Sequence, residues 1–143
     1  MPPDKAEVKL RAVKRCLKDK SILVVDDDPA WTGAMVKLLE SLGASVNSAA
    51  NGTDCIRLLR SVHFDLVLLD ILMPGIDGWD VFAMMKNILQ NREIPVLILT
   101  GLTKEGVSEK LARLPVPENQ VLQKNSPPET ILQAICKILS PPE

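Results

Sequence analysis

The sequence predicts a doubly wound α/β domain, in which helices cover both faces of a parallel five-stranded sheet. Five short apolar runs are continuous along the chain and do not alternate with polar residues. Such runs are typical of parallel strands, which are buried on both faces. Helical patterns separate the runs, and strands that alternate with helices favour right-handed crossovers. We expect strands at about 21–26, 44–48, 65–69, 95–99 and 119–123.

The helix after the first strand has the clearest boundaries. Asp28 is a suitable N-cap, and Pro29 occupies the first helical position, where proline is tolerated. Gly43 follows the helix at the position that prefers a left-handed backbone. Its apolar residues recur on one face, at Trp31, Met35, Leu38 and Leu42.

Three further helices show the same periodicity, and a fourth is weak. Their apolar residues are Cys55, Leu58, Leu59 and Val62; Val81, Met84, Met85 and Ile88; and Ile131, Ile135, Ile138 and Leu139. The weak helix covers roughly 104–113, contains Gly106 and precedes a proline-rich segment that cannot continue a helix.

Length and composition limit the function classes. With 143 residues and 46% hydrophobic content, one domain with a proper core is expected. A net charge of −1 provides no bulk attraction to nucleic acid, so we expect no direct contact with it. No apolar stretch approaches the roughly 20 residues that span a bilayer, and the charged N-terminus does not read as a signal peptide. The sequence therefore predicts a cytoplasmic protein without membrane contact.

The N-terminal segment differs from the body. Residues 1–20 carry seven Lys and Arg against three acids, whereas the remainder carries ten against fifteen. Asp4 and Glu7 form a capping-box pattern, and Ala6, Leu10, Val13 and Leu17 share one stripe. This helix either packs on its own domain, forms a homodimer contact or ends a linker from a longer protein. We thus divide the chain into a basic helical extension, 1–20, and a domain, 21–140.

The cysteines are three in number, far apart and in helical segments. This pattern favours reduced, buried thiols over a disulfide or a metal site.

Polar side chains follow four of the predicted strands. Asp26 and Asp27 follow the first, Asp70 the third, Thr100 the fourth and Lys124 the fifth. In open α/β sheets, ligands bind beyond the carboxyl ends of the strands, so we expect these groups to meet. Crowded carboxylates repel unless a hard cation holds them, and oxygen ligands suit Mg²⁺.

This constellation predicts a site that accepts a phosphoryl group. Asp70 stands alone after the central run and is the better nucleophile, while Asp26 and Asp27 hold the cation. Lys124 and the Thr100 hydroxyl would then contact the phosphoryl oxygens. Taken singly, each residue has a structural explanation such as a turn, a cap or a solvated surface group. Asp28 is expected to be only a cap, His63 a surface residue, and Trp31 and Trp79 reporters near the site that do not take part.

Four segments resemble the receiver domain of two-component response regulators, including the single-domain chemotaxis type. They are Val24–Asp27, Leu68–Gly78, Leu97–Gly101 and Leu122–Lys124, and the resemblance covers about residues 21–139. It implies a flavodoxin-like sheet of order 2-1-3-4-5. It also implies transfer of a phosphoryl group from a phosphohistidine of a sensor histidine kinase or phosphotransfer protein to Asp70. Magnesium would be held by Asp26 through water, by Asp27 and Asp70, and by the backbone carbonyl of Leu72.

The resemblance describes a phosphoacceptor that catalyses its own phosphorylation and is not an enzyme in the usual sense. We expect no DNA-binding segment after the last predicted helix. The output would therefore pass to a downstream protein target, or the chain would be part of a hybrid histidine kinase.

Several features depart from the family pattern, and two of them bear on the site. Asn125 stands where the family usually has proline after the lysine, often with a cis bond. Leu72 and Leu102 flank the expected site with apolar side chains, so we expect poor positioning of an attacking water and a long-lived acyl phosphate.

Three alternatives remain at this point. Asp26-x-Asp28 matches the start of haloacid-dehalogenase-like phosphatases, although only Glu129 and Glu143 follow the lysine and Asp70 would have no role. A flavin-binding role is disfavoured, because carboxylates occupy the loop where a phosphate needs hydroxyls and amides. The third is a degenerate receiver that acts only as a docking module.

Overall fold

The computed structural model describes residues 4–70, 80, 81, 83, 93–101 and 120–139. Its strands form one parallel sheet in the order β2-β1-β3-β4-β5. The strands are β1 (Ser21–Val25), β2 (Ser45–Ala49), β3 (Leu66–Asp70), β4 (Val96–Thr100) and β5 (Val121–Gln123). The predicted fold class and strand order are confirmed, and the strand bounds differ from those predicted by one or two residues.

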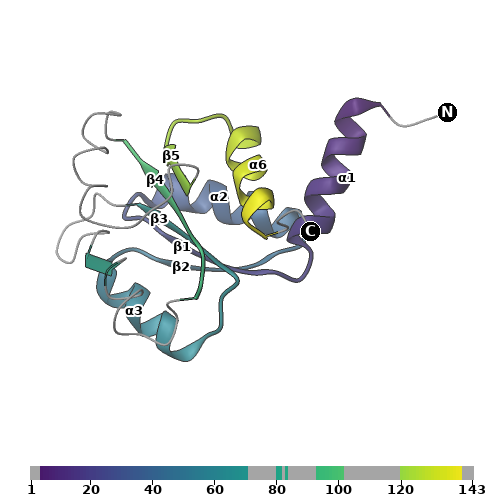
Figure 1. The fold of residues 1–143 in the computed structure, drawn as a ribbon. Helices are drawn as coiled ribbons and strands as arrows, with labels where there is room; N and C mark the ends of the chain where they lie inside the picture. The colour runs from purple at the N-terminus through teal and green to yellow at the C-terminus, as the bar shows by residue number, and fades with distance from the viewer. Residues whose placement is uncertain (1–3, 71–79, 82, 84–92, 102–119, 140–143) are drawn as a thin grey trace.

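Helices cover both faces of this sheet (Figure 1). α2 (Pro29–Ser41) and α6 (Pro128–Leu139) lie on one face, and α3 (Gly52–Ser61) lies on the other. Leu66 and Leu68 of β3 face the first layer, whereas Val67 and Leu69 face the second. The expected helices at 81–88 and 104–113 fall largely or wholly outside the described residues.

The two edge strands are less buried than the sequence predicted. Ser45, Asn47 and Ser48 of β2 are exposed, and all three residues of β5 are only half-buried. β1, β3 and β4 are almost fully buried, because each has a strand on both sides as well as packing against its faces. The expectation of five buried strands is therefore wrong for most of β2 and for β5.

The boundaries of α2 follow the prediction. The carboxylate of Asp28 accepts hydrogen bonds from the backbone N–H groups of Ala30 (3.0 Å) and Trp31 (3.3 Å). Gly43 has φ +101°, a backbone region that L side chains rarely adopt. These two residues direct the chain from β1 into α2 and from α2 into β2.

The N-terminal extension forms a helix that projects from the body of the domain, α1 (Lys5–Leu17) (Figure 1). Asp4 caps it by accepting a hydrogen bond from the N–H of Glu7 at 2.8 Å. Residues 5–12 are exposed, whereas Val13 is half-buried and Cys16 and Leu17 are buried. The predicted apolar stripe thus packs on the domain only at its C-terminal end.

A disulfide joins Cys16 of α1 to Cys136 of α6. The prediction of three reduced cysteines is wrong for this pair, and it is confirmed only for Cys55, which is free and buried. The two Cα atoms are 5.7 Å apart across a sequence separation of 120 residues. This distance lies within the range that a disulfide requires, and the contact between the two helices creates it.

None of the helices within the described part of the chain combines the length and the apolar character needed to cross a membrane.

Candidate functional site

The carboxyl ends of four strands bring the predicted residues to one edge of the sheet. Val25 of β1 pairs with Leu69 of β3, so the next residues, Asp26 and Asp70, face each other one step further along. The backbone N–H of Lys124 donates a hydrogen bond to the carbonyl oxygen of Thr100 at 2.8 Å. The register of the parallel strands therefore assembles two acids, a hydroxyl and an ammonium from distant parts of the sequence.

Most of these side chains are buried. The exposed fractions are 2% for Asp26, 5% for Asp70 and 0% for Thr100, whereas Asp27 is exposed. A buried carboxylate is costly unless a cation or hydrogen-bond donors compensate its charge. The site therefore requires positive charge.

Lys124 supplies one such charge. Its Nζ lies 2.7 Å from Oδ2 of Asp26 and 3.5 Å from Oδ2 of Asp70. Partial burial opposes the ammonium form, but the carboxylates of Asp26, Asp70 and Asp28 outweigh this effect and raise the pKa of Lys124. Lys124 reaches both acids although Asn125 follows it in place of the usual proline.

The two carboxylate oxygens of Asp26 have different partners. Oδ1 accepts a hydrogen bond from the N–H of Asp28 at 2.9 Å, which orients the group. Oδ2 lies 2.7 Å from Nζ of Lys124. That contact is an ion pair, and a carboxylate oxygen has a second lone pair that another cation can use.

The donor set fits a small divalent cation. Asp26, Asp27 and Asp70 each place a carboxylate oxygen within 4.8 Å of the others. Hard oxygen ligands of this kind, together with water, are what Mg²⁺ prefers. The fourth predicted ligand, the carbonyl of Leu72, lies outside the described residues, as do Leu102 and Trp79.

The structure adds one contact that sequence reasoning missed. The ring centroid of Trp31, in the first turn of α2, lies 5.3 Å from Nζ of Lys124. This distance permits a cation–π interaction, so Trp31 contacts the site and is more than a reporter near it. The sequence feature that could have indicated this contact is the position of Trp31 shortly after Asp26 and Asp27. His63 is a surface residue, as predicted, with 82% of its side chain exposed.

Comparisons with known proteins agree with this geometry. The response regulator receiver domain model matches residues 22–136. The chain is 34% identical to Protein PilH of Pseudomonas aeruginosa over 83% of this chain and 97% of that protein. It is 30% identical to Protein PilG of the same organism over 80% of this chain and 83% of that protein.

A solved structure shares the fold as well. The signal receiver domain of a signal transduction histidine kinase from Syntrophus aciditrophicus superposes with a TM-score of 0.76 at 26% identity, covering 85% of this chain and 90% of that one. The sheet order, the strand-end acids and these matches agree with one another. The chain therefore belongs to the response regulator receiver domains of two-component systems.

Proposed function

We propose that Asp70 is the residue that accepts the phosphoryl group in this receiver domain. One observation carries the proposal: the carboxylate of Asp70 is 5% exposed and lies 3.5 Å from the ammonium of Lys124, beside the two other acids. This combination offers a nucleophile, a cation for the incoming group and a set of metal ligands at the end of one central strand.

The chemistry follows from these positions. A carboxylate oxygen of Asp70 attacks phosphorus, and a P–O bond forms as the P–N bond to the phosphohistidine of the donor breaks. Lys124 stabilises negative charge on the phosphoryl oxygens, and Thr100 donates its hydroxyl hydrogen bond to one of them. Asp26 keeps Lys124 at the edge of the sheet until the phosphoryl group offers it a new partner.

Asp26, Asp27 and Asp70 would hold Mg²⁺, with the carbonyl of Leu72 as a further predicted ligand. When bound, the ion supplies positive charge that offsets both the carboxylates and the phosphoryl oxygens. The three carboxylate oxygens, which lie within 4.8 Å of one another, support this assignment.

The alternatives are less well supported. A haloacid-dehalogenase-like phosphatase would need acids after Lys124. That interpretation also leaves Asp70 without a role, although Asp70 lies within the acidic cluster. Burying two carboxylates beside an ammonium costs desolvation free energy, and a module that only docks partners would gain no chemistry in return. We therefore expect a phosphoacceptor that does not turn over a substrate of its own.

Intact mass spectrometry tests the assignment. The wild-type protein, incubated with acetyl phosphate and Mg²⁺, should gain one phosphoryl group, and a chelator should prevent this gain. Asp70→Asn should gain none, whereas Asp54→Asn, at a carboxylate of α3 that is not part of the acidic cluster, should behave as wild type. Borohydride reduction and peptide mapping then locate the acyl phosphate.

Each other outcome has a clear meaning. Equal uptake by wild type and Asp70→Asn, or uptake by neither, would refute the assignment. Phosphorylation of Asp26 would favour the phosphatase reading, and folded protein that takes up nothing would favour the docking module.

The partners of the proposed function follow from the family. Receiver domains interact with histidine kinases and downstream effectors. We propose a histidine kinase or phosphotransfer protein as the donor and a protein, not nucleic acid, as the target. A cytoplasmic location remains a prediction of the sequence.

We also propose that α1 contacts a second copy of the chain. Val8 and Leu10 are 50% and 47% exposed on the part of α1 that projects from the body. The helix is rich in lysine and arginine, so the dimer should weaken at low salt. Sedimentation of wild type and Leu10→Lys at two salt concentrations tests this contact, and identical monomeric behaviour would refute it.

A further inference from the structure

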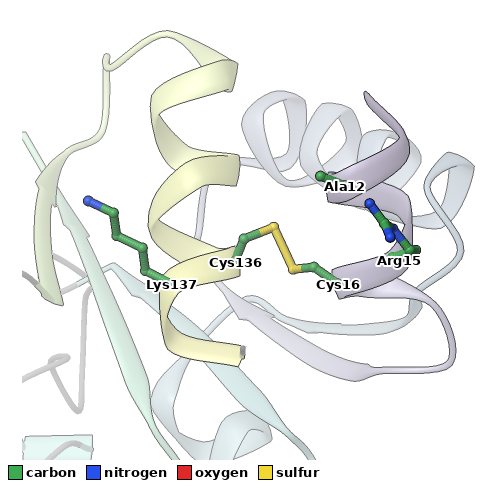
Figure 2. A pocket seen from close by; sticks show the side chains of 5 residues that line it. All are labelled: Ala12, Arg15, Cys16, Cys136 and Lys137. Atoms are coloured by element: carbon green, nitrogen blue, oxygen red, sulfur yellow. A yellow bond between two sulfur atoms is a disulfide. The ribbon is translucent and has the colours of Figure 1, made fainter. Parts of the chain in front are cut away.

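A disulfide joins α1 to α6, outside the acidic site at the strand ends. Figure 2 shows the Cys16–Cys136 disulfide bridging the two helices. We call this contact the α1–α6 junction, formed by Val13, Cys16 and Leu17 of α1 and Cys136 of α6, all in one apolar cluster.

The junction is the place where α1 is held. Residues 5–12 are exposed, so the first eight positions of the helix have no burial against the domain. A helix of 13 residues is marginal in water without tertiary packing. The attachment of α1 therefore depends on one buried turn and one covalent bond. Asp19 follows with φ 62°, a left-handed backbone that gives a sharp change of direction between α1 and β1.

The disulfide is also within reach of solvent. An open pocket of about 390 Å³ lies between the helices and is lined by Ala12, Arg15, Cys16, Cys136 and Lys137. Cys136 is half-buried, and each cysteine has a basic neighbour in the lining. By contrast, burial raises the pKa of Cys55 to about 12, so this third thiol is inert.

We propose that Cys16 and Cys136 form a thiol–disulfide exchange site that fixes α1 on α6 when oxidised and releases α1 when reduced. The reductant is a small dithiol or a protein with a dithiol site. One thiolate of the reductant bonds to Sγ of Cys136, the S–S bond breaks, and its electron pair leaves on Sγ of Cys16, which then takes up a proton. The second thiol of the reductant attacks the mixed disulfide and frees Cys136, so two electrons and two protons pass to the protein.

The first experiment measures the redox state and its accessibility. Alkylation of denatured, non-reduced protein should label one cysteine, Cys55, and three after reduction. Protein that is treated with dithiothreitol while folded, and is then denatured and alkylated, should reach the three-label state after minutes of treatment. Three labels before any reduction, even after treatment with glutathione disulfide, would overturn the proposal. So would a disulfide that dithiothreitol reduces only after denaturation.

The second experiment measures the release of α1 by amide hydrogen exchange. Reduction should speed exchange in residues 5–17 by at least tenfold and leave β1 and β3 unchanged. Cys136→Ser should show the reduced pattern with or without dithiothreitol, whereas Cys55→Ala should respond as wild type. Equal protection of α1 in both redox states would overturn the proposal. Neither readout uses phosphorylation, so the result is independent of the role of Asp70.

Discussion

The strand-end site and the α1–α6 junction are stabilised in opposite ways. At the strand ends, two almost fully buried carboxylates surround one ammonium, at 2.7 and 3.5 Å. At the junction, charged side chains stay exposed, and apolar contacts with a disulfide join the helices.

The strand-end site is therefore expected to serve the chemistry, and the α1–α6 junction to serve the stability of the fold. Buried ion pairs add little net stability, because desolvation offsets the attraction between the charges. A disulfide that closes a long loop stabilises a fold by restricting the unfolded chain. We therefore expect substitutions in the first region to change chemistry most, and those in the second to change stability most.

The largest expected effect is on the free energy of unfolding when the disulfide is reduced. The bond closes a loop of 120 residues, so its loss should cost about 4 kcal/mol. Urea denaturation of oxidised and reduced protein measures this difference. Cys55→Ala should show the same difference, and Cys16→Ser should show none. If the free energies of unfolding of the oxidised and reduced proteins differ by less than about 1 kcal/mol, the apolar contacts alone stabilise the junction.

The next largest effect concerns Lys124. Lys124→Gln should slow phosphoryl uptake from acetyl phosphate about 100-fold, or about 3 kcal/mol, because the charged donor to the phosphoryl oxygens is lost. Lys37→Gln, an exposed lysine on α2, is the control and should keep the wild-type rate. Circular dichroism confirms that each variant is folded. Unchanged uptake in folded Lys124→Gln would remove Lys124 from the site.

A pH effect is expected from Cys55, which belongs to neither region. Burial raises the pKa of this thiol from 9.0 to about 12 in the folded protein. Between these values the unfolded chain loses a proton that the folded chain keeps, so stability falls as pH rises. The loss should be about 1.4 kcal/mol at pH 10 and absent at pH 7. Urea denaturation at both pH values should show this loss in wild type and not in Cys55→Ala; equal losses in the two proteins would contradict it.

The smallest effect is expected at Trp31. Trp31→Leu removes the ring beside Lys124 and should slow phosphoryl uptake two- to fivefold, since a partly exposed cation–π contact contributes about 0.5–1 kcal/mol. Trp31→Phe should retain part of the effect, because its ring is a weaker partner. If Leu and Phe at this position behave alike, the ring does not position the lysine.

Sequence periodicity and capping were sufficient for much of the fold. Continuous apolar runs located the three central strands, and Asp28, Pro29 and Gly43 marked the ends of α2, because these effects operate within a few residues. The strand-end rule also predicted that Asp26, Asp70, Thr100 and Lys124 would meet. That prediction needed only the parallel direction of the strands, not the details of packing.

Other features depended on contacts between distant residues. The ring of Trp31 beside Lys124 and the Cys16–Cys136 disulfide have no signal in local spacing. Each requires knowledge of which elements are neighbours and how far a side chain reaches. The sequence by itself determined the sheet and the chemistry at its edge, because both follow from local patterns repeated along the chain. Only the tertiary structure decided how the N-terminal helix is attached, because that contact spans 120 residues and depends on where two helices cross.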